Sequence, residues 1–168
     1  MSPDGNSRYP AGVVSRLPME KLIRIVVANP HPIIRGDLRL LLERESVFRV
    51  IGEAADGREA VMLAEYRRPD VVLLDVKLPL LNGLAAAREI SSKKPELGIV
   101  FVSALADQEY VAEAFKSGAR GYVLADDVQT DLLFAVRLVA GQGRFLSPSL
   151  RAKLIGGGGT ASGDAWFG

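Results

Sequence analysis

The sequence contains no cysteine and only one histidine, His31, among its 168 residues. Without cysteine there can be no disulfide bond, no thiol catalysis and no cysteine-ligated zinc or iron–sulfur site. One histidine cannot build a histidine-rich metal centre. The apolar runs are far too short to cross a bilayer, and the N-terminus lacks the long apolar core of a signal peptide. We therefore expect a cytoplasmic protein with no membrane segment.

The sequence also lacks an excess of positive or negative residues. Lysine and arginine number 21, aspartate and glutamate number 20, and the formal net charge is +1. This balance gives no electrostatic footprint for nucleic acid or for a membrane surface, so we expect no direct nucleic-acid binding by this chain. The hydrophobic share of 48% is enough for a packed core in one domain of ordinary size.

The two ends of the chain differ in composition from its middle. Residues 1–20 hold three prolines and two glycines with little periodicity, which predicts a disordered leader. Residues 146–168 predict a short helical segment and then a glycine-rich tail. We expect the folded domain to be residues 21–145. The C-terminal segment is too short for a three- or four-helix DNA-binding module, so none is expected in this chain.

Apolar strand patterns alternate with helical patterns along the middle of the chain. Strands are predicted at 22–28, 48–54, 71–75, 98–103 and 120–124, and helices at 32–45, 57–68, 83–94, 107–118 and 128–143. Five strands alternating with five helices predict an α/β fold with a five-stranded, doubly wound parallel sheet of the flavodoxin-like (βα)5 kind. Ligands of such sheets bind outside the carboxyl ends of the strands.

One carboxylate stands at such an end, within the stretch PDVVLLDVKLPLLNG at 69–83. Asp75 follows the apolar residues 71–74, and a carboxylate beside a buried strand is costly unless its charge is used. Asp75 is therefore the candidate site residue from which the functional interpretation starts.

The segments around Asp75 resemble a known family. In chain order they are RIVVANPHPIIRGDLRLLLE, VIGEAADGREAV, RPDVVLLDVKLPLLNGLAAAREI, EYVAEAFKSGARGYVLAD and FLSP. Together they resemble the receiver domain of response regulators, and most of all its NarL/FixJ (LuxR-type) subgroup, over about residues 22 to 148. The resemblance implies a role in two-component phosphorelay signalling, in which Asp75 would accept a phosphoryl group from a kinase phosphohistidine.

The resemblance also implies which helpers that chemistry needs. An acidic pair after the first strand holds Mg²⁺ together with the phosphoacceptor and a backbone carbonyl, here that of Lys77. A hydroxyl at the end of the fourth strand, matched by Ser103, bonds a phosphoryl oxygen, and a lysine after the fifth strand neutralises charge. Tyr122 matches an aromatic switch position, and Pro79 lies in the most specific block of the match.

The sequence departs from the family at three of these positions. Asn29 and Pro30 stand where the acidic pair belongs, and Ala125 stands where the lysine belongs. A unit charge at about 4 Å is worth roughly 4 kcal/mol at an effective dielectric constant near 20. We therefore expect weak Mg²⁺ binding, no other cofactor, no metal or catalytic residue, and a degenerate site at which Asp75 is an inefficient phosphoacceptor.

Three residues near Asp75 each allow two interpretations. Lys77 either replaces part of the missing cation or is a solvated loop lysine. Ser103 and Tyr122 either form a switch pair or serve only the packing of the fold.

The favoured hypothesis is an atypical receiver domain, not an enzyme, that acts through protein partners such as a sensor histidine kinase or another regulator. Its expected contact face comprises the helix at 107–118, the strand at 120–124 and the helix at 128–143, and a homodimer through that face is plausible. The candidate contact residues are Tyr110, Phe115, Leu133 and Tyr122.

Two alternatives belong to other classes. The first is the regulatory half of a NarL/FixJ-type transcription regulator whose helix-turn-helix domain is absent from this chain and whose Asp75 is still phosphorylated. The second is a flavodoxin-like flavin or nucleotide binder. The second is disfavoured, because no glycine-rich phosphate cradle follows the first strand.

Overall fold

The computed structural model describes residues 21–156, and the predicted leader and glycine-rich tail lie outside the described residues. It contains one parallel sheet in the order β2-β1-β3-β4-β5-β6. The strands are β1 (Ile23–Ala28), β2 (Phe48–Ala54), β3 (Val71–Leu74), β4 (Gly98–Ser103), β5 (Gly121–Leu124) and β6 (Phe145–Leu146). The helices are α2 (Pro32–Leu42), α3 (Gly57–Arg67), α4 (Gly83–Lys93), α5 (Gln108–Lys116), the 3₁₀ turn η1 (Ala125–Asp127), α6 (Val128–Ala140) and α7 (Pro148–Gly156).

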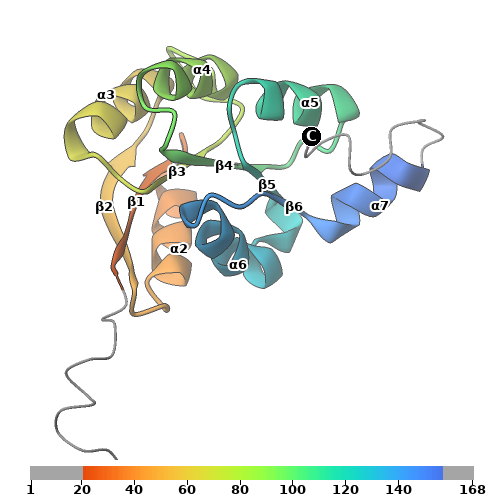
Figure 1. Ribbon diagram of the computed structural model, residues 1–168, viewed down its shortest axis with the longest axis horizontal. Coiled ribbons are helices and arrows are strands. Elements are labelled where there is room, and N and C mark those ends of the chain that lie inside the picture. The colour runs from red at the N-terminus through yellow and green to blue at the C-terminus, as the bar shows by residue number, and fades with distance from the viewer. Residues whose placement is uncertain (1–20, 157–168) are drawn as a thin grey trace, which may run out of the picture.

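Helices cover both faces of the sheet, so the doubly wound α/β prediction is confirmed (Figure 1). One hydrophobic cluster lies between the sheet and α3, α4 and α5, and the other between the sheet and α2 and α6. Alternate residues of each strand enter opposite clusters, as in β3, where Val72 and Leu74 face the first and Val71 and Leu73 the second. Burial on both faces explains why these strands are continuous apolar runs.

A short sixth strand and a seventh helix extend the five predicted pairs. β6 pairs with β5 through Gly121–Phe145 and Tyr122–Leu146. Leu150 of α7 is completely buried in the same cluster as Tyr122. Ser147 fixes the turn between β6 and α7, because its hydroxyl donates to Asp131 and accepts from the amide of Leu124. The packed unit therefore continues past residue 145 into α7.

No helix among residues 21–156 is long and apolar enough to cross a membrane.

Side-chain caps set where the helices around the site begin. Asp56 accepts a hydrogen bond from the amide of Glu59 at the start of α3, and Asn82 accepts one from Ala85 at the start of α4. Pro32 opens α2, where its missing N–H costs nothing. The polar residues between strands and helices thus specify the turns at the carboxyl edge of the sheet.

Gly83 closes the loop that follows Asp75. Its amide donates to the carbonyl of Val76 over 2.8 Å, and a Cβ atom at this position would lie 2.0 Å from the backbone oxygen of Asp75. The start of α4 can therefore reach the end of β3 only because residue 83 has no side chain. This contact explains the spacing between Asp75 and Gly83 in the sequence.

We predict that Gly83→Ala lowers the free energy of unfolding by about 2 kcal/mol or more, because the added methyl group overlaps backbone that cannot move freely. Gly36→Ala is the matched control: Gly36 lies within α2, and a Cβ atom there would meet nothing within 4 Å. That change should stabilise the fold by about 0.5–1 kcal/mol. Urea unfolding of both variants measures the difference, and equal stabilities would contradict the close approach.

Candidate functional site at the carboxyl edge of the sheet

Asp75 is held in place by backbone groups of neighbouring segments. Its amide donates to the carbonyl of Ala28 over 3.3 Å, which ties it to the end of β1. Its Oδ1 accepts from the amide of Lys77 over 3.1 Å, and its Oδ2 lies 3.4 Å from Nδ2 of Asn29. The carboxylate is half-buried at the carboxyl edge of the sheet, as the sequence predicted.

Asn29 is a buried amide that contacts Asp75 directly. Its side chain is 5% exposed, its Nδ2 faces Asp75, and its Oδ1 accepts from the amide of His31 over 2.8 Å. The backbone amide of Asn29 donates to Ala54 in β2. Both ends of the side chain thus have a hydrogen-bond partner. The amide presents its NH₂ group, and no anionic oxygen, to Asp75. The neighbouring Pro30 supplies no side-chain ligand.

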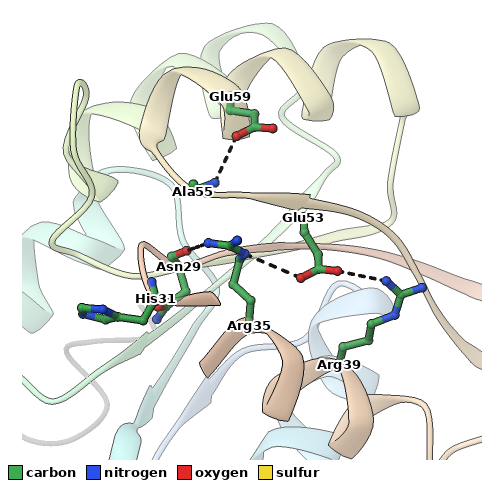
Figure 2. A network of polar contacts seen from close by, with 7 residues as sticks. All are labelled: Asn29, His31, Arg35, Arg39, Glu53, Ala55 and Glu59. Atoms are coloured by element: carbon green, nitrogen blue, oxygen red, sulfur yellow. Dashed lines mark hydrogen bonds and ion pairs between the residues drawn. The ribbon is translucent and has the colours of Figure 1, made fainter. Parts of the chain in front are cut away.

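Two arginines and a glutamate that the sequence did not single out hold this edge of the sheet together (Figure 2). Arg35 donates to the carbonyl of Asn29 over 2.7 Å, and its Nε lies 3.6 Å from Glu53. Arg39 reaches the other oxygen of Glu53 over 2.9 Å. Figure 2 shows the carboxylate of Glu53, from β2, between the side chains of Arg35 and Arg39, which come from successive turns of α2. The four-residue spacing places Arg35 and Arg39 on one side of α2, but nothing in the sequence shows that Glu53 of β2 faces them.

Ser103 and Tyr122 meet at the segment after β4. The hydroxyl of Ser103 accepts from the amide of Leu105 over 3.1 Å, and the hydroxyl of Tyr122 donates to the carbonyl of Leu105 over 2.6 Å. Both side chains are buried, and the ring of Tyr122 lies 6.2 Å from that of Phe101. The two predicted switch residues are therefore joined through the backbone of one residue.

The remaining predicted site residues lie at the rim. Ala125 is exposed at the start of η1 and places no functional group near Asp75. Lys77 is exposed, and within the described chain only its backbone amide, not its ammonium, contacts Asp75. The carbonyl of Pro79 accepts from Gly57 and Leu81, which anchors the loop against the start of α3. The exposed Lys77 thus contacts Asp75 through its backbone amide and acts on the carboxylate with its charge only from a longer distance.

Burial is the main influence on the ionisation of the two titratable site residues. It raises the pKa of Asp75 above the ordinary value of 3.8, while the amides of Lys77 and Val76 and the charges of His31 and Lys77 oppose the shift. Burial also raises the pKa of Tyr122; the hydroxyl of Ser103 opposes that shift, and the charges of Asp75 and Asp107 add to it. Among residues 21–156, no cation lies close enough to Asp75 to outweigh the effect of burial on its pKa.

The side chains around Asp75 do not supply the ligands that Mg²⁺ requires. Mg²⁺ prefers anionic oxygen ligands in octahedral geometry. The Oδ2 of Asp75 faces the NH₂ group of Asn29, and Pro30 contributes no side-chain ligand, so neither residue that follows β1 supplies an anionic oxygen. Among residues 21–156 no group of three or more histidine, cysteine, aspartate or glutamate side chains is arranged to hold a metal ion. The side chains present do not match the ligand set of that ion.

A pocket of about 460 Å³ opens beside Asp75. Its walls come from the ends of β1, β3 and β4, from one side of α2, and from the start of α6. Asn29, Asp75, Ser103 and Ala125 all line it. The structure therefore brings four of the predicted site residues together around one cavity.

The predicted contact face is only partly exposed. Tyr110 on α5 is 40% exposed, whereas Phe115 and Leu133 are half-buried and pack against the two hydrophobic clusters. Tyr122 is completely buried, so its prediction as a surface contact residue is wrong for this conformation. Its position on β5 turns the ring toward α5 and the first cluster, and the pattern of a four-residue strand did not reveal which face it occupied.

Comparison with known families matches residues 25–137 to the response regulator receiver domain. Among curated proteins, the chain is 34% identical to the transcriptional regulatory protein DegU of Brevibacillus brevis over 81% of this chain and 58% of that protein. It is 39% identical to the transcriptional regulatory protein PdtaR of Mycobacterium tuberculosis over 72% of this chain and 58% of that protein. The chain spans about three fifths of the length of such relatives.

Solved structures agree with this match. A LuxR-family two-component response regulator from Aurantimonas sp. SI85-9A1 superposes with a TM-score of 0.78 at 30% identity, covering 82% of this chain and 98% of that one. The signal receiver domain of the response regulator NarL from Mycobacterium tuberculosis gives a TM-score of 0.69 at 31% identity, with 72% and 98% covered. The chain therefore belongs to the family of response regulator receiver domains, with relatives of the NarL/LuxR type.

Proposed function

We propose that this chain is an atypical receiver domain whose Asp75 is phosphorylated poorly and whose output is carried mainly by protein–protein contacts. The observation that carries the proposal is the buried amide of Asn29, whose Nδ2 faces Asp75 at 3.4 Å where the family has an anionic metal ligand. The proposal also takes the chain to be a signalling module and not an enzyme.

The chemistry of phosphoryl transfer supports this proposal. A receiver carboxylate attacks phosphorus, so the developing charge on the phosphoryl oxygens needs a metal ion and a cation held in place. Here Asn29 and Pro30 replace the metal-binding acids, and Ala125 replaces the cation. Since about 1.4 kcal/mol corresponds to a tenfold change in rate, losing several charge interactions of a few kcal/mol each slows transfer by orders of magnitude.

A contact face with an exposed aromatic supports output by association. Tyr110 stands on the outer side of α5, and a large amphipathic side chain of this type is enriched at interface centres. We propose that the face formed by α5, β5 and α6 pairs two copies of the chain or binds a partner protein.

A second candidate function is favoured by the relatives. Their names are those of transcriptional regulatory proteins, and the chain spans about three fifths of their length. On this alternative the chain is the regulatory half of a DNA-binding transcription regulator, and Asp75 is still its phosphoacceptor. Phosphorylation of the unmodified protein separates the two candidates.

The rate of Asp75 phosphorylation tests the proposed function. Asn29→Asp and Pro30→Asp combined with Ala125→Lys should increase the rate of Asp75 phosphorylation by acetyl phosphate and Mg²⁺ at least about a hundredfold, because several charge interactions are rebuilt. Intact mass spectrometry follows the added phosphoryl group, and the same triple variant with Asp75→Asn is the control. Equal rates in the wild type and the triple variant would show that these positions do not limit the chemistry.

The pKa of Asp75 tests whether a cation compensates its charge. Its pKa in the folded protein should lie above 3.8, because burial disfavours the anion. As pH rises, Asp75 therefore ionises in the unfolded chain before it ionises in the folded protein. Its contribution to the free energy of unfolding falls as pH rises from 3.8 through the raised pKa, and it stays lower above that pKa. Asn29→Asp should raise the pKa further by placing a second carboxylate beside it.

Carbon-13 NMR of the Asp75 carboxyl group measures its pKa in the wild type and in Asn29→Asp. Urea unfolding of wild type and Asp75→Asn at matched pH values should show the variant gaining relative stability through the same window. A pKa at or below 3.8, or a lower pKa in Asn29→Asp, would contradict the description of Asp75 as a carboxylate without a compensating cation.

Self-association of the chain tests the proposed contact face. Tyr110→Glu should weaken self-association at least about tenfold, as removal of a central interface aromatic does, whereas Asp75→Asn should leave it unchanged. Tyr66→Glu is the matched control, because Tyr66 on α3 is 76% exposed and lies outside the proposed face. Sedimentation velocity gives the dimer constants. Loss of the dimer in Asp75→Asn but not in Tyr110→Glu would make Asp75 the operative switch.

A further inference from the structure

The pocket beside Asp75 has the size of a small-molecule site. Its volume is about 460 Å³, and pockets that enclose small organic ligands typically measure about 300–1,000 Å³. It lies at the carboxyl edge of a parallel sheet, between the ends of β1, β3 and β4 and the helices α2 and α6. Ligands of doubly wound sheets bind in this region.

One wall of the pocket is apolar. Leu38 and Leu41 of α2 and Val102 of β4 form its floor, and all three belong to the second hydrophobic cluster. Ile34 on α2 and Val128 at the start of α6 continue this surface toward solvent. Ile34 is 43% exposed although it stands beside this floor. Because Leu38, Leu41 and Val102 are already buried, an apolar ligand body would remove from water mainly the surface of Ile34 and of the half-buried Val128, which is favourable in proportion to the area covered.

The polar wall carries an unbalanced negative charge. Asp75 and Asp37 both line the pocket, and the described residues of the wall include no lysine or arginine. His31 is the single basic side chain among them. Ala125 leaves open the place where a lysine would otherwise enter, and the ammonium of Lys77 is not part of the wall. Asp75 is half-buried, so its charge is screened less than a surface carboxylate.

We propose that this pocket binds a small organic amine, with its ammonium group between Asp75 and Asp37 and its apolar body against Ile34, Leu41 and Val102. The ammonium supplies the positive charge that the protein lacks at this position. The oxygens of Asn29 and Ser103 already accept backbone hydrogen bonds from His31 and Leu105, and Gln129 adds a neutral amide to the lining. The two carboxylates are the anionic acceptors of the wall, and an ammonium group is drawn to them more strongly than to a neutral oxygen.

The probe is 2-phenylethylamine, titrated into the nitrogen-15-labelled full chain and followed by backbone amide shifts. We expect saturable shifts confined to the residues around the pocket, near Asn29, Asp75, Ser103 and Val128. The uncharged analogue 2-phenylethanol, the anion 3-phenylpropanoate and the small cation methylammonium should each bind at least about tenfold more weakly, because each lacks the charge or the apolar body.

Three variants locate the binding. Asp75→Asn and Ala125→Lys should each weaken the amine at least about tenfold, the first by removing an anion and the second by adding a cation. Ala125 is exposed, so lysine is tolerated there by the fold. Glu96→Gln is the control, because it makes the same change of charge as Asp75→Asn just before β4, at the opposite edge of the sheet.

The proposal is overturned if the amine produces no saturable shifts up to its solubility limit, if the alcohol binds as tightly as the amine, or if Glu96→Gln weakens binding as much as Asp75→Asn. It is independent of the proposed function, because phosphorylation is detected by mass and association by sedimentation. A chain that is phosphorylated efficiently can still bind the amine, and one that does not bind it can still associate.

Discussion

The burial of β3 on both faces is the constraint on which the site depends. Its four residues are all buried between the two helical layers, and it is hydrogen-bonded to β1 on one side and β4 on the other. The strand cannot slip by one residue without exchanging the side chains of its two faces. Asp75, the next residue, is therefore placed at the middle of the sheet edge, with the ends of β1 and β4 on either side. Every other feature of the site is arranged around that fixed carboxylate.

Most of the fold follows from apolar periodicity and turn chemistry. The strand predicted at 98–103 has those bounds, and the one predicted at 71–75 ends one residue earlier, at Leu74. The helices at 32, 57, 83 and 128 begin where proline, a capping residue or a loop predicts. β6 is the exception, because a two-residue strand carries no period of its own. It forms through pairing with β5 and through Ser147, an interaction between segments that no local pattern displays.

The site was predictable in its membership and less so in its contacts. The order of the elements places Asp75, Ser103 and Asn29 at one edge, because carboxyl ends of parallel strands share it. The sequence could not show that the amide of Asn29 faces Asp75, that Tyr122 and Ser103 meet at Leu105, or that Glu53 joins Arg35 to Arg39. Each of these depends on rotamers and on helix position relative to the sheet. The cavity depends in the same way on the spacing of α2 and α6.

The two edges of the sheet also limit how copies of this chain can meet. An open strand edge offers unpaired backbone groups to another chain and favours aggregation. Here β6 is only two residues long and is followed directly by α7, while the opposite edge strand, β2, carries Arg49 and Glu53. β6 is too short to template another strand, and the seven-residue β2 is interrupted by charged side chains. Sheet-to-sheet growth into fibres is therefore disfavoured by the architecture, and contacts between copies are directed to helical surfaces, where side chains set the specificity.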